Sequence, residues 1–354
     1  MDIATSLCVD DRRHPASRYA QLLDVKADQR RQIYWRCVVV FFATSVRCNP
    51  TLRHVLYTND DAPGSWNKID YRAFLSELGV EIRQLPFTDF QPPAGFSTEF
   101  RNAFYKLEVM QTLASPTAGP SSVLFDSDCV WTRPAAELAP LLTAGAGPLL
   151  LTVLADSTPD TKIEGLSRRE IGYLYRKIYP DYPVHVPTYF GGEIIGGSRM
   201  ELAHLTAELW ATWQHLQRAY PTEPPRFSNQ ESLYDNDEYV LNLVLNRRPK
   251  LAWVDASPFI RRIWTSHRFT NVKPTDAQLP IWHLPSEKLQ GLPVLCRRAL
   301  APNSQFWRVP LPSFGAYLGR YLGVTAPTWA PQRLLALATK LPRMLVLVKR
   351  LLAQ

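Results

Sequence analysis

Short apolar segments alternate with amphipathic ones along the first half of the chain. The apolar segments end in polar turns and predict strands at 3–9, 54–58, 80–85, 122–125 and 149–154. Between them, apolar residues at helical spacing predict helices at 70–78 and 100–114. Residues 19–48 indicate mainly a helix, although the β-branched run 38–42 would also suit a strand. This alternation is typical of an α/β fold with a mostly parallel sheet and helices on both faces.

The second half of the chain is less regular. A strand is expected at 189–197, between two glycine pairs, and further strands at 251–254 and 281–284. Helices are predicted at 199–219 and 237–246, the second apolar around most of its surface. Residues 156–187 are polar and rich in tyrosine, and we expect an irregular, substrate-facing excursion there. We expect one catalytic domain, residues 1–330, followed by a helical tail, residues 331–354.

Charge is concentrated in that tail. The chain carries a formal charge of +8, and residues 331–354 contribute five basic side chains and no acid. A nucleic-acid-binding domain would carry its basic residues on the folded part, so no nucleic-acid partner is expected. The tail predicts an amphipathic helix, interrupted at Pro342, that contacts an anionic membrane or alternatively packs on the domain. We favour the membrane.

Cysteine usage and the N-terminal residues indicate the compartment. The five cysteines include no C-x-x-C pair, so we expect reduced thiols rather than a zinc site or a disulfide framework. The N-terminal residues lack a secretory pattern, and no apolar run reaches the roughly 18 residues of a spanning helix. The expected location is cytoplasmic, with peripheral contact on the inner face of the membrane.

Two acids follow the apolar strand at 122–125. Asp126 and Asp128 are separated by one residue, so both can face one site if the strand geometry persists. The carboxyl end of a central strand is where open α/β sheets bind ligands. Adjacent carboxylates repel unless a cation or proton neutralises them, and oxygen ligands suit Mn²⁺ or Mg²⁺. The alternative is that both acids cap a turn. The second Asp-x-Asp, at 235–237, lacks this context.

Several motifs occur in an order that resembles a known family. They are F-Y-K-L at 104–107, D-S-D at 126–128, F-G-G-E-I-I-G-G at 190–197, D-E-Y-V-L-N at 237–242, and W-H at 282–283 followed by Lys288 and Gly291. This order resembles bacterial GT-A glycosyltransferases and is similar in layout to the glycogenin-like and galactosyltransferase-like retaining families. The resemblance implies a Rossmann-like GT-A fold. It also implies transfer of a sugar from a nucleoside diphosphate sugar, UDP-sugar favoured, to a saccharide or glycolipid hydroxyl.

The resemblance also implies roles for single residues. Asp128 would bind the metal directly, Asp126 would approach the ribose or the metal, and His283 would complete the metal site. Lys288 and Gly291 would hold the diphosphate, although the family's glycine between the histidine and the lysine, and its Pro-Trp after the lysine, are absent here. The alternative for His283 is a packed strand residue.

Further candidates line the same expected site. Lys106, and with it Arg101, could pair with phosphate or with Asp126, while a snorkelling surface lysine is the alternative. Gly192 would let the backbone approach the donor sugar closely, or would serve only a bend in the fold. By resemblance, Asn59 would lie near the nucleotide together with Asp10 and Asp11, although turn chemistry explains Asn59 equally well.

One helix carries a polar stripe, Glu238, Asn242 and Asn246, at four-residue spacing. Asp237 or Glu238 could serve as a general base, which would favour inversion. Alternatively, both acids favour the helix N-terminus electrostatically and the asparagines face water. The roles implied for His283 and Lys288 favour retention, which we expect.

Two other functions compete with glycosyl transfer. A nucleotidyltransferase would normally show a glycine-rich loop after its first strand, whereas residues 10–13 are Asp-Asp-Arg-Arg. A catalytically inactive, membrane-associated scaffold of the same fold would not bind nucleotide in a metal-dependent way.

Overall fold

The computed structural model describes residues 1–10, 17, 22, 25–62, 64–96, 100–153, 158–163, 165–248, 252–266 and 269–324. The predicted basic tail at 331–354 lies outside these residues. Within the described ranges, no helix is both long enough and apolar enough to cross a membrane.

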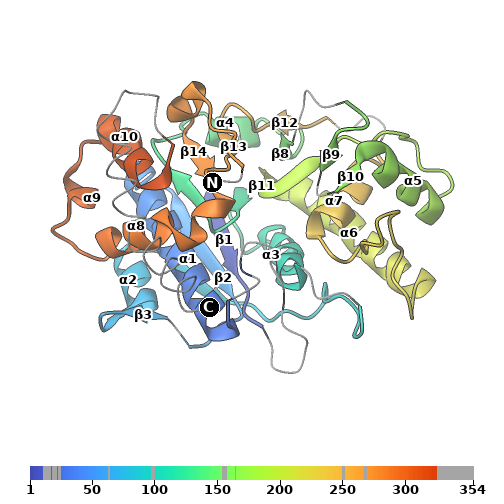
Figure 1. Cartoon of the computed structure of the whole chain (residues 1–354), viewed down its shortest axis with the longest axis horizontal. Coiled ribbons are helices and arrows are strands. Elements are labelled where there is room, and N and C mark those ends of the chain that lie inside the picture. Colours follow the sequence, from blue (N-terminus) through green and yellow to red (C-terminus); the bar gives the residue numbers. More distant parts are fainter. Residues whose placement is uncertain are drawn as a thin grey trace, which may run out of the picture.

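A seven-stranded sheet forms the centre of the molecule (Figure 1). Its strands are, in spatial order, β12 (Val254–Asp255), β8 (Leu149–Thr152), β11 (Phe190–Ser198), β6 (Ser121–Phe125), β1 (Asp2–Leu7), β2 (Arg53–Thr58) and β5 (Glu81–Gln84). All of the pairings except those of β11 are parallel, and β11 runs antiparallel to both β6 and β8. The predicted α/β fold with a mostly parallel sheet is therefore confirmed.

Helices cover both faces of this sheet (Figure 1). On one side lie α1 (Ala27–Cys48), α2 (Tyr71–Glu77), α8 (Gly291–Ala299), α9 (Gln305–Arg308) and α10 (Leu311–Leu322). On the other lie α3 (Tyr105–Leu113), α5 (Arg168–Ile178), α6 (Arg199–Ala219) and α7 (Asp237–Leu245). Strand residues alternate between the two cores: Val123 and Phe125 pack with the first set of helices, and Leu124 packs with the second.

The run 38–42, for which a strand remained an alternative, lies inside α1. Helix α1 packs against α8 and β7 (Cys129–Trp131), and the side chains of residues 38–42 are fully buried. Tertiary burial therefore outweighs the strand preference of the β-branched residues. The strand alternative is wrong.

The segment 156–187, expected to be irregular and substrate-facing, contains regular structure, so the expectation of irregularity is wrong. Strands β9 (Lys162–Ile163) and β10 (Leu166–Ser167) form a small hairpin, and α5 follows at once. A capping box starts α5, in which the side chain of Ser167 accepts from the Glu170 N–H and Glu170 accepts from the Ser167 N–H. The Ser-x-x-Glu signature was present in the sequence and was overlooked.

A second, three-stranded sheet positions the residues that matter below. In it, β14 (Ile281–His283) lies between β13 (Ile260–Arg262), which is parallel to it, and β7, which is antiparallel. The register places Arg262 beside His283, and His283 opposite Cys129. Because Asp128 directly precedes β7, this pairing brings the late histidine to the end of β6.

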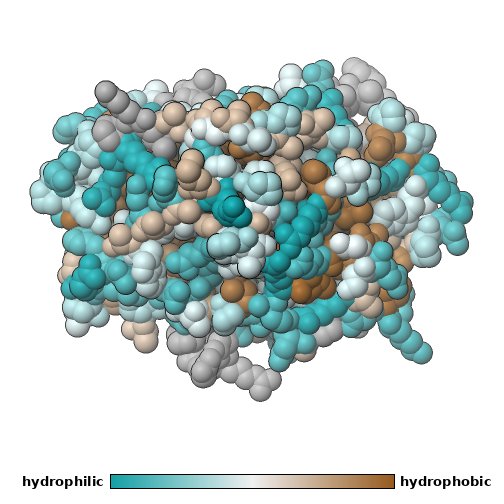
Figure 2. All heavy atoms as spheres, turned by 180° about the vertical axis from the view of Figure 1, so that it is seen from behind, coloured by the Kyte–Doolittle hydropathy of each residue, from teal (hydrophilic) through white to brown (hydrophobic). Residues whose placement is uncertain are grey.

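The remaining elements are short. They are the hairpin β3 (Ser65–Trp66) and β4 (Ile69–Asp70), helix α4 (Leu138–Thr143), and the 3₁₀ helices η2 (Arg101–Phe104), η3 (Pro274–Gln278) and η4 (Pro285–Leu289). The face seen from behind is mainly hydrophilic, with hydrophobic side chains in separate patches (Figure 2). Such scattered exposure is normal for a folded domain.

Candidate functional site

A cavity opens at the carboxyl ends of β1 and β6. Its lining includes seven residues that the sequence nominated: Lys106, Asp126, Asp128, Asp237, Glu238, His283 and Lys288. They come from five separate stretches of the chain, which the central sheet and the small second sheet bring together. The cavity therefore lies at the edge of the sheet where ligands bind in open α/β folds.

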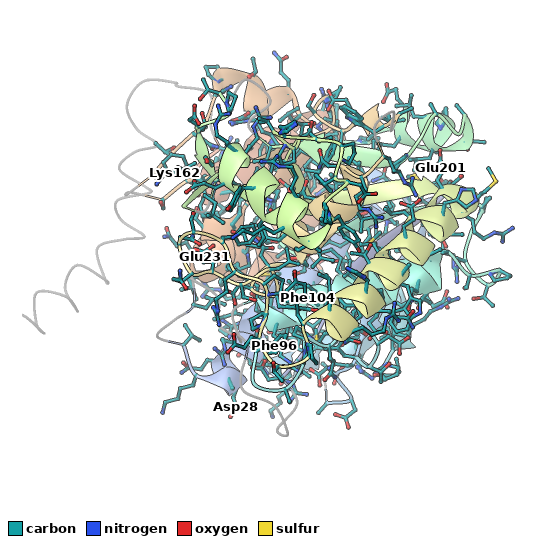
Figure 3. All side chains as sticks on the ribbon, turned by 90° about the vertical axis from the view of Figure 1, so that its right-hand side faces the viewer. Asp28, Phe96, Phe104, Lys162, Glu201 and Glu231 are labelled. Carbon is teal, nitrogen blue, oxygen red and sulfur yellow. The ribbon has the colours of Figure 1, made fainter. Side chains whose placement is uncertain are left out.

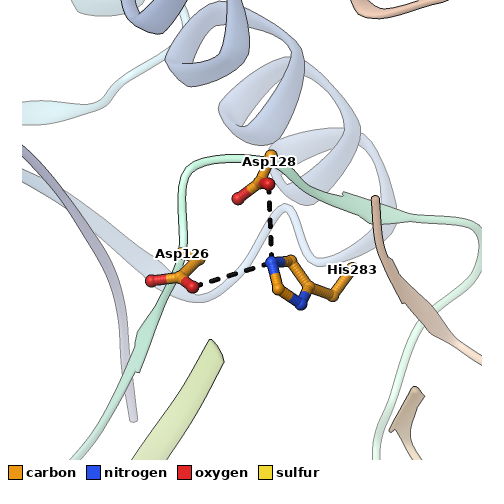
Figure 4. Close-up of side chains that lie close together, drawn as sticks. All are labelled: Asp126, Asp128 and His283. Carbon is orange, nitrogen blue, oxygen red and sulfur yellow. Dashed lines mark ion pairs between the residues drawn. The ribbon is translucent and has the colours of Figure 1, made fainter. Parts of the chain in front are cut away.

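Two carboxylates and one imidazole converge in this cavity (Figure 4). The Nε2 atom of His283 lies 3.6 Å from Oδ2 of Asp126 and 3.4 Å from Oδ2 of Asp128. One ligand atom from each residue lies within 4.8 Å of the other two. Ligands on opposite sides of a divalent ion lie about 4 Å apart, so a small contraction would let all three share an ion. Two carboxylate oxygens and one imidazole nitrogen are ligands suited to a divalent cation.

Backbone hydrogen bonds hold this cluster in place. The N–H of Asp126 donates to the carbonyl of Glu193 in β11, 3.1 Å away. The carbonyl of Asp128 accepts from the N–H of Leu284, also at 3.1 Å. Each aspartate is thus fixed to a different neighbouring strand, and their separation does not depend on the turn between them alone.

Cations balance the charge on Asp128. Burial alone would raise the pKa of this carboxyl, but Lys288, whose Nζ hydrogen-bonds to Asp128, and then His283 hold it well below its usual range. Burial would lower the pKa of His283, but Asp128 above all raises it to about 9. The positive charges of Lys288 and His283 and the negative charge of Asp128 therefore stabilise one another.

Lys106 sits at the centre of a second group. Its Nζ lies 2.9 Å from Oδ1 of Asp126, 3.2 Å from Oδ2 of Asp237, and 2.8 Å from the carbonyl oxygen of Gly192. Burial opposes the charged form, but Asp126 and then Asp237 outweigh it and raise the pKa of Lys106. Because the side chain is 8% exposed, the alternative of a snorkelling surface lysine is wrong.

Glu193 and Arg262 belong to the site, although the sequence analysis missed both. Glu193 is fully buried and accepts two hydrogen bonds from Arg262, at 2.9 and 2.6 Å. It also faces Nδ1 of His283 at 3.5 Å. A carboxylate behind a histidine ligand orients the imidazole and increases its basicity. The available signal was a single acid inside the apolar, glycine-bracketed strand at 190–197.

The polar stripe of α7 has a structural role that neither earlier interpretation included. Asn242 exchanges hydrogen bonds with the backbone of Phe190, at 2.7 and 2.8 Å, and Asn246 does the same with Thr188, at 2.8 and 2.9 Å. Both asparagines are buried, so the alternative in which they face water is wrong. Their amides satisfy backbone groups of the chain entering β11.

The two acids at the start of α7 differ in their surroundings. Glu238 accepts from the N–H of Gly192 at 2.9 Å and from the guanidinium of Arg262. Asp237 has Lys106 as its nearest cation, and burial raises its pKa to about 6 against the pull of that lysine. Asp237 can therefore exchange a proton near neutral pH, whereas Glu238 is held as a hydrogen-bond acceptor.

Arg101 and Asn59, two of the nominated residues, lie outside the cavity lining. Arg101 donates to the side chain of Gln91 at 3.1 Å. Asn59 exchanges hydrogen bonds with the backbone of Val9, at 2.8 and 3.0 Å, and so fixes the end of β1. The carboxylate of Asp10 accepts hydrogen bonds from the N–H of Ser17 and from the side-chain amide of Asn102. Asp11 lies outside the described residues.

The two nominated glycines allow close contacts rather than lining the cavity. A Cβ on Gly192 would lie 2.8 Å from Nζ of Lys106, so glycine leaves the room that this lysine needs. A Cβ on Gly291 would lie 2.4 Å from the carbonyl oxygen of Tyr321 in α10. The N–H of Gly291 donates a hydrogen bond to the side-chain carboxylate of Glu287, 2.9 Å away.

Together, the fold and the cavity define an α/β protein with a carboxylate–histidine cluster suited to a divalent cation. No protein-family model matches the sequence, and no curated protein matches it. Among solved structures, the chain is similar to the bifunctional glycosyltransferase WbbM in its apo form, at 13% identity and a TM-score of 0.48. That match covers 79% of this chain and 45% of WbbM.

An active-site mutant of LgtC is similar at 13% identity, with a TM-score of 0.45, over 80% of this chain and 87% of LgtC. Because these similarities are distant, the function has to be inferred from the chemistry of the cavity.

Proposed function

We propose that this protein is a metal-dependent glycosyltransferase. It would transfer a sugar from a nucleoside diphosphate sugar, with UDP-sugar as our first choice, to a hydroxyl of a saccharide or glycolipid. The observation that carries the proposal is the convergence of Asp126, Asp128 and His283 in a cavity at the carboxyl ends of β1 and β6. Ions such as Mg²⁺ are usually bound in proteins by one or two carboxylates together with the phosphates of the substrate.

The chain's own residues would bind and orient the donor. Asp126, Asp128 and His283 would hold Mn²⁺ or Mg²⁺, which when bound spreads the charge that develops on the leaving diphosphate. Lys288 lines the cavity and hydrogen-bonds to Asp128, and its ammonium would also bind a phosphate oxygen.

Retention of the anomeric configuration is the stereochemical part of the proposal. Inversion needs a carboxylate that is available to take a proton from the acceptor hydroxyl. The roles implied for His283 and Lys288 support retention, whereas Asp237 and Glu238, which line the same cavity, are the residues that would supply the base for inversion. NMR of the first-formed anomer tests this. A product of inverted configuration would overturn it.

Calorimetric binding of UDP, with and without Mn²⁺, tests the function itself. We expect micromolar binding that needs the metal and that is lost in Asp128→Asn. The matched control, Asp255→Asn, changes an exposed aspartate outside the cavity and should bind as the wild type does. If the wild type binds no nucleotide, the proposal fails and an inactive scaffold of this fold becomes the better description.

We further propose a role in the synthesis of a cell-envelope glycan or glycolipid, with residues 331–354 in contact with the membrane. The chain of residues 1–354 should co-sediment with vesicles containing phosphatidylglycerol, and a chain ending at residue 330 should not. Equal sedimentation of both forms would remove the tail from the proposal.

A further inference from the structure

A second cavity lies on the α5 side of the molecule, between that helix and the loop at 226–230. Its volume is about 690 Å³, and we call it the basic pocket. Its lining includes Arg169, Glu170, Tyr173, Arg176, Lys177 and Arg226. Figure 3 looks onto this side, with α5 in front and Glu231, which follows the loop, below it.

Cationic groups outnumber acids in the basic pocket. Among the described residues, Arg169, Arg176, Lys177 and Arg226 line it, and Glu170 is the one carboxylate. Glu170 is already occupied, because it accepts from Ser167 in the capping box and from Ser228 at 2.8 Å. The pocket therefore presents an excess of positive charge that its own acid does not offset.

The arginines are positioned by weak partners. Arg176 donates to the carbonyl of His185 at 3.3 Å, and Arg226 donates to the carbonyl of Gln230 at 2.7 Å. These neutral acceptors orient a guanidinium without neutralising it. Arg169 pairs with Asp160 at 3.1 Å, but both side chains are more than half exposed, so the pair is worth little. Their remaining N–H groups can bind an incoming anion in the bidentate mode typical of arginine.

An aromatic surface accompanies these charges. The side chain of Tyr173 is 58% exposed, and Nζ of Lys177 lies 4.7 Å from the centre of its ring. The opposite wall includes Phe227, which is 3% exposed. An exposed tyrosine offers a rigid, amphipathic surface for the apolar face of a sugar ring. Ring stacking beside guanidinium groups indicates a saccharide that carries carboxylate or phosphate groups.

Packing connects the basic pocket to the central cavity. The ring of Phe227 lies 4.7 Å from the ring of Tyr239, centre to centre. Tyr239 follows Glu238, which lines the central cavity, and its carbonyl accepts from the hydroxyl of Tyr175 in α5 at 2.7 Å. The first turn of α7 thus lines the central cavity and packs against Phe227, a residue of the basic pocket.

We propose that the basic pocket binds an anionic saccharide segment of the acceptor. Only the statement that this saccharide is the acceptor rests on the proposed function. The binding of the saccharide can be measured without any transfer reaction. It narrows the substrate class from any saccharide or glycolipid to one with acidic groups at a distance from the hydroxyl that is glycosylated.

Calorimetry with tetragalacturonic acid on the full chain tests the proposal, with maltotetraose as the neutral counterpart and inorganic phosphate as the bare anion. We expect the acidic tetrasaccharide to bind the wild type more tightly than either of the others. The double variant Arg176→Ala/Arg226→Ala should bind it at least about tenfold more weakly, since two charge-assisted contacts are lost. Tyr173→Ala should weaken it as well.

The matched control is Arg320→Ala, which removes an exposed arginine from α10, on the opposite side of the molecule (Figure 1). It should bind as the wild type does. Equal binding of maltotetraose, binding of phosphate as tight as that of the saccharide, or unchanged binding by the double variant would each overturn the proposal. So would substitution-sensitive binding to phosphatidylglycerol vesicles in the absence of saccharide binding, which would assign the pocket to a lipid surface.

Failure of this proposal is distinguishable from failure of the proposed function. The double variant should keep the metal-dependent binding of UDP, because its substitutions lie outside the central cavity. Conversely, Asp128→Asn should lose UDP and keep tetragalacturonic acid. Loss of both ligands in either variant, measured on folded protein, would contradict the separation of the two sites.

Discussion

The ammonium group of Lys106 lies 2.9 Å from the carboxylate of Asp126. The same group lies 3.2 Å from Asp237, so one buried cation joins the end of β6 to the start of α7. Charge balance in the cavity therefore depends on a residue of α3, the helix that directly precedes β6.

Replacing that cation should destabilise the fold. Lys106→Met keeps much of the side-chain volume but leaves Asp126 and Asp237 facing each other without a positive charge. We expect a loss of about 3 kcal/mol in the free energy of unfolding, measured with urea. Removing one member of a buried ion pair leaves the charge of the other member uncompensated. Adding Asp237→Asn should recover part of this loss, and Lys162→Met, at an exposed lysine, should cost little. An unchanged stability in Lys106→Met would show that the pair contributes nothing.

Glu193 should act as a positioning residue for the metal site. Glu193→Gln keeps the shape of the side chain and removes the charge that faces Nδ1 of His283 and binds Arg262. We expect the affinity for Mn²⁺ to fall by about 10–100-fold, as measured by calorimetry. Glu208→Gln, on the outer face of α6, serves as the control. A variant with lower stability but wild-type Mn²⁺ affinity would reduce Glu193 to a purely structural role.

His54 should make stability depend on pH. Burial lowers the pKa of its imidazole from 6.5 to about 4, with Nε2 held 2.9 Å from the hydroxyl of Ser45. The unfolded chain takes up this proton near pH 6.5 and the folded chain only near pH 4. The contribution is therefore complete above pH 6.5 and is lost as the pH falls, by about 3 kcal/mol in total.

Urea unfolding of His54→Gln across pH 4–7 checks this effect. The variant should lose stability less steeply on acidification than the wild type, whereas His204→Gln, at an exposed histidine, should follow the wild type. Parallel curves for His54→Gln and the wild type would contradict the assignment.

The two nominated glycines should respond in opposite ways to alanine. In Gly192→Ala the new methyl would displace Nζ of Lys106, so we expect weaker UDP–Mn²⁺ binding with a modest change in stability. In Gly291→Ala the methyl would meet the backbone of Tyr321, so we expect a loss of about 2 kcal/mol with binding retained. Thermal unfolding and calorimetry on both variants decide this. Weak UDP binding by folded Gly291→Ala would instead support the diphosphate role that the family resemblance implied.

Local pattern was enough to place Asp126 and Asp128, because a buried strand and the turn after it are encoded within a few residues. Lys106 was found for the same reason, since its helix precedes that strand directly. Arg262 could not be found in this way. It lies in β13, a three-residue strand that carries too few residues to show a period, and its contact with Glu193 spans 69 positions.

The asparagines of α7 show the same limit. Their four-residue spacing was visible, but their partners are backbone groups 52 and 58 positions earlier, which no side-chain pattern identifies. A buried polar stripe and a solvated one look alike until the element that faces the stripe is known. Helix α5, by contrast, carried a readable capping signal.

The hydrogen bonds between α7 and the segment at 188–192 match two different repeats. Glu238, Asn242 and Asn246 advance by four residues, about 6 Å along a helix, while Gly192, Phe190 and Thr188 step back by two, close to 7 Å along a strand. The helix and the extended segment can therefore form all of these hydrogen bonds in only one alignment. Inserting or deleting a single residue in either segment would therefore misalign every later contact, so this seam should tolerate changes of residue type far better than changes of length.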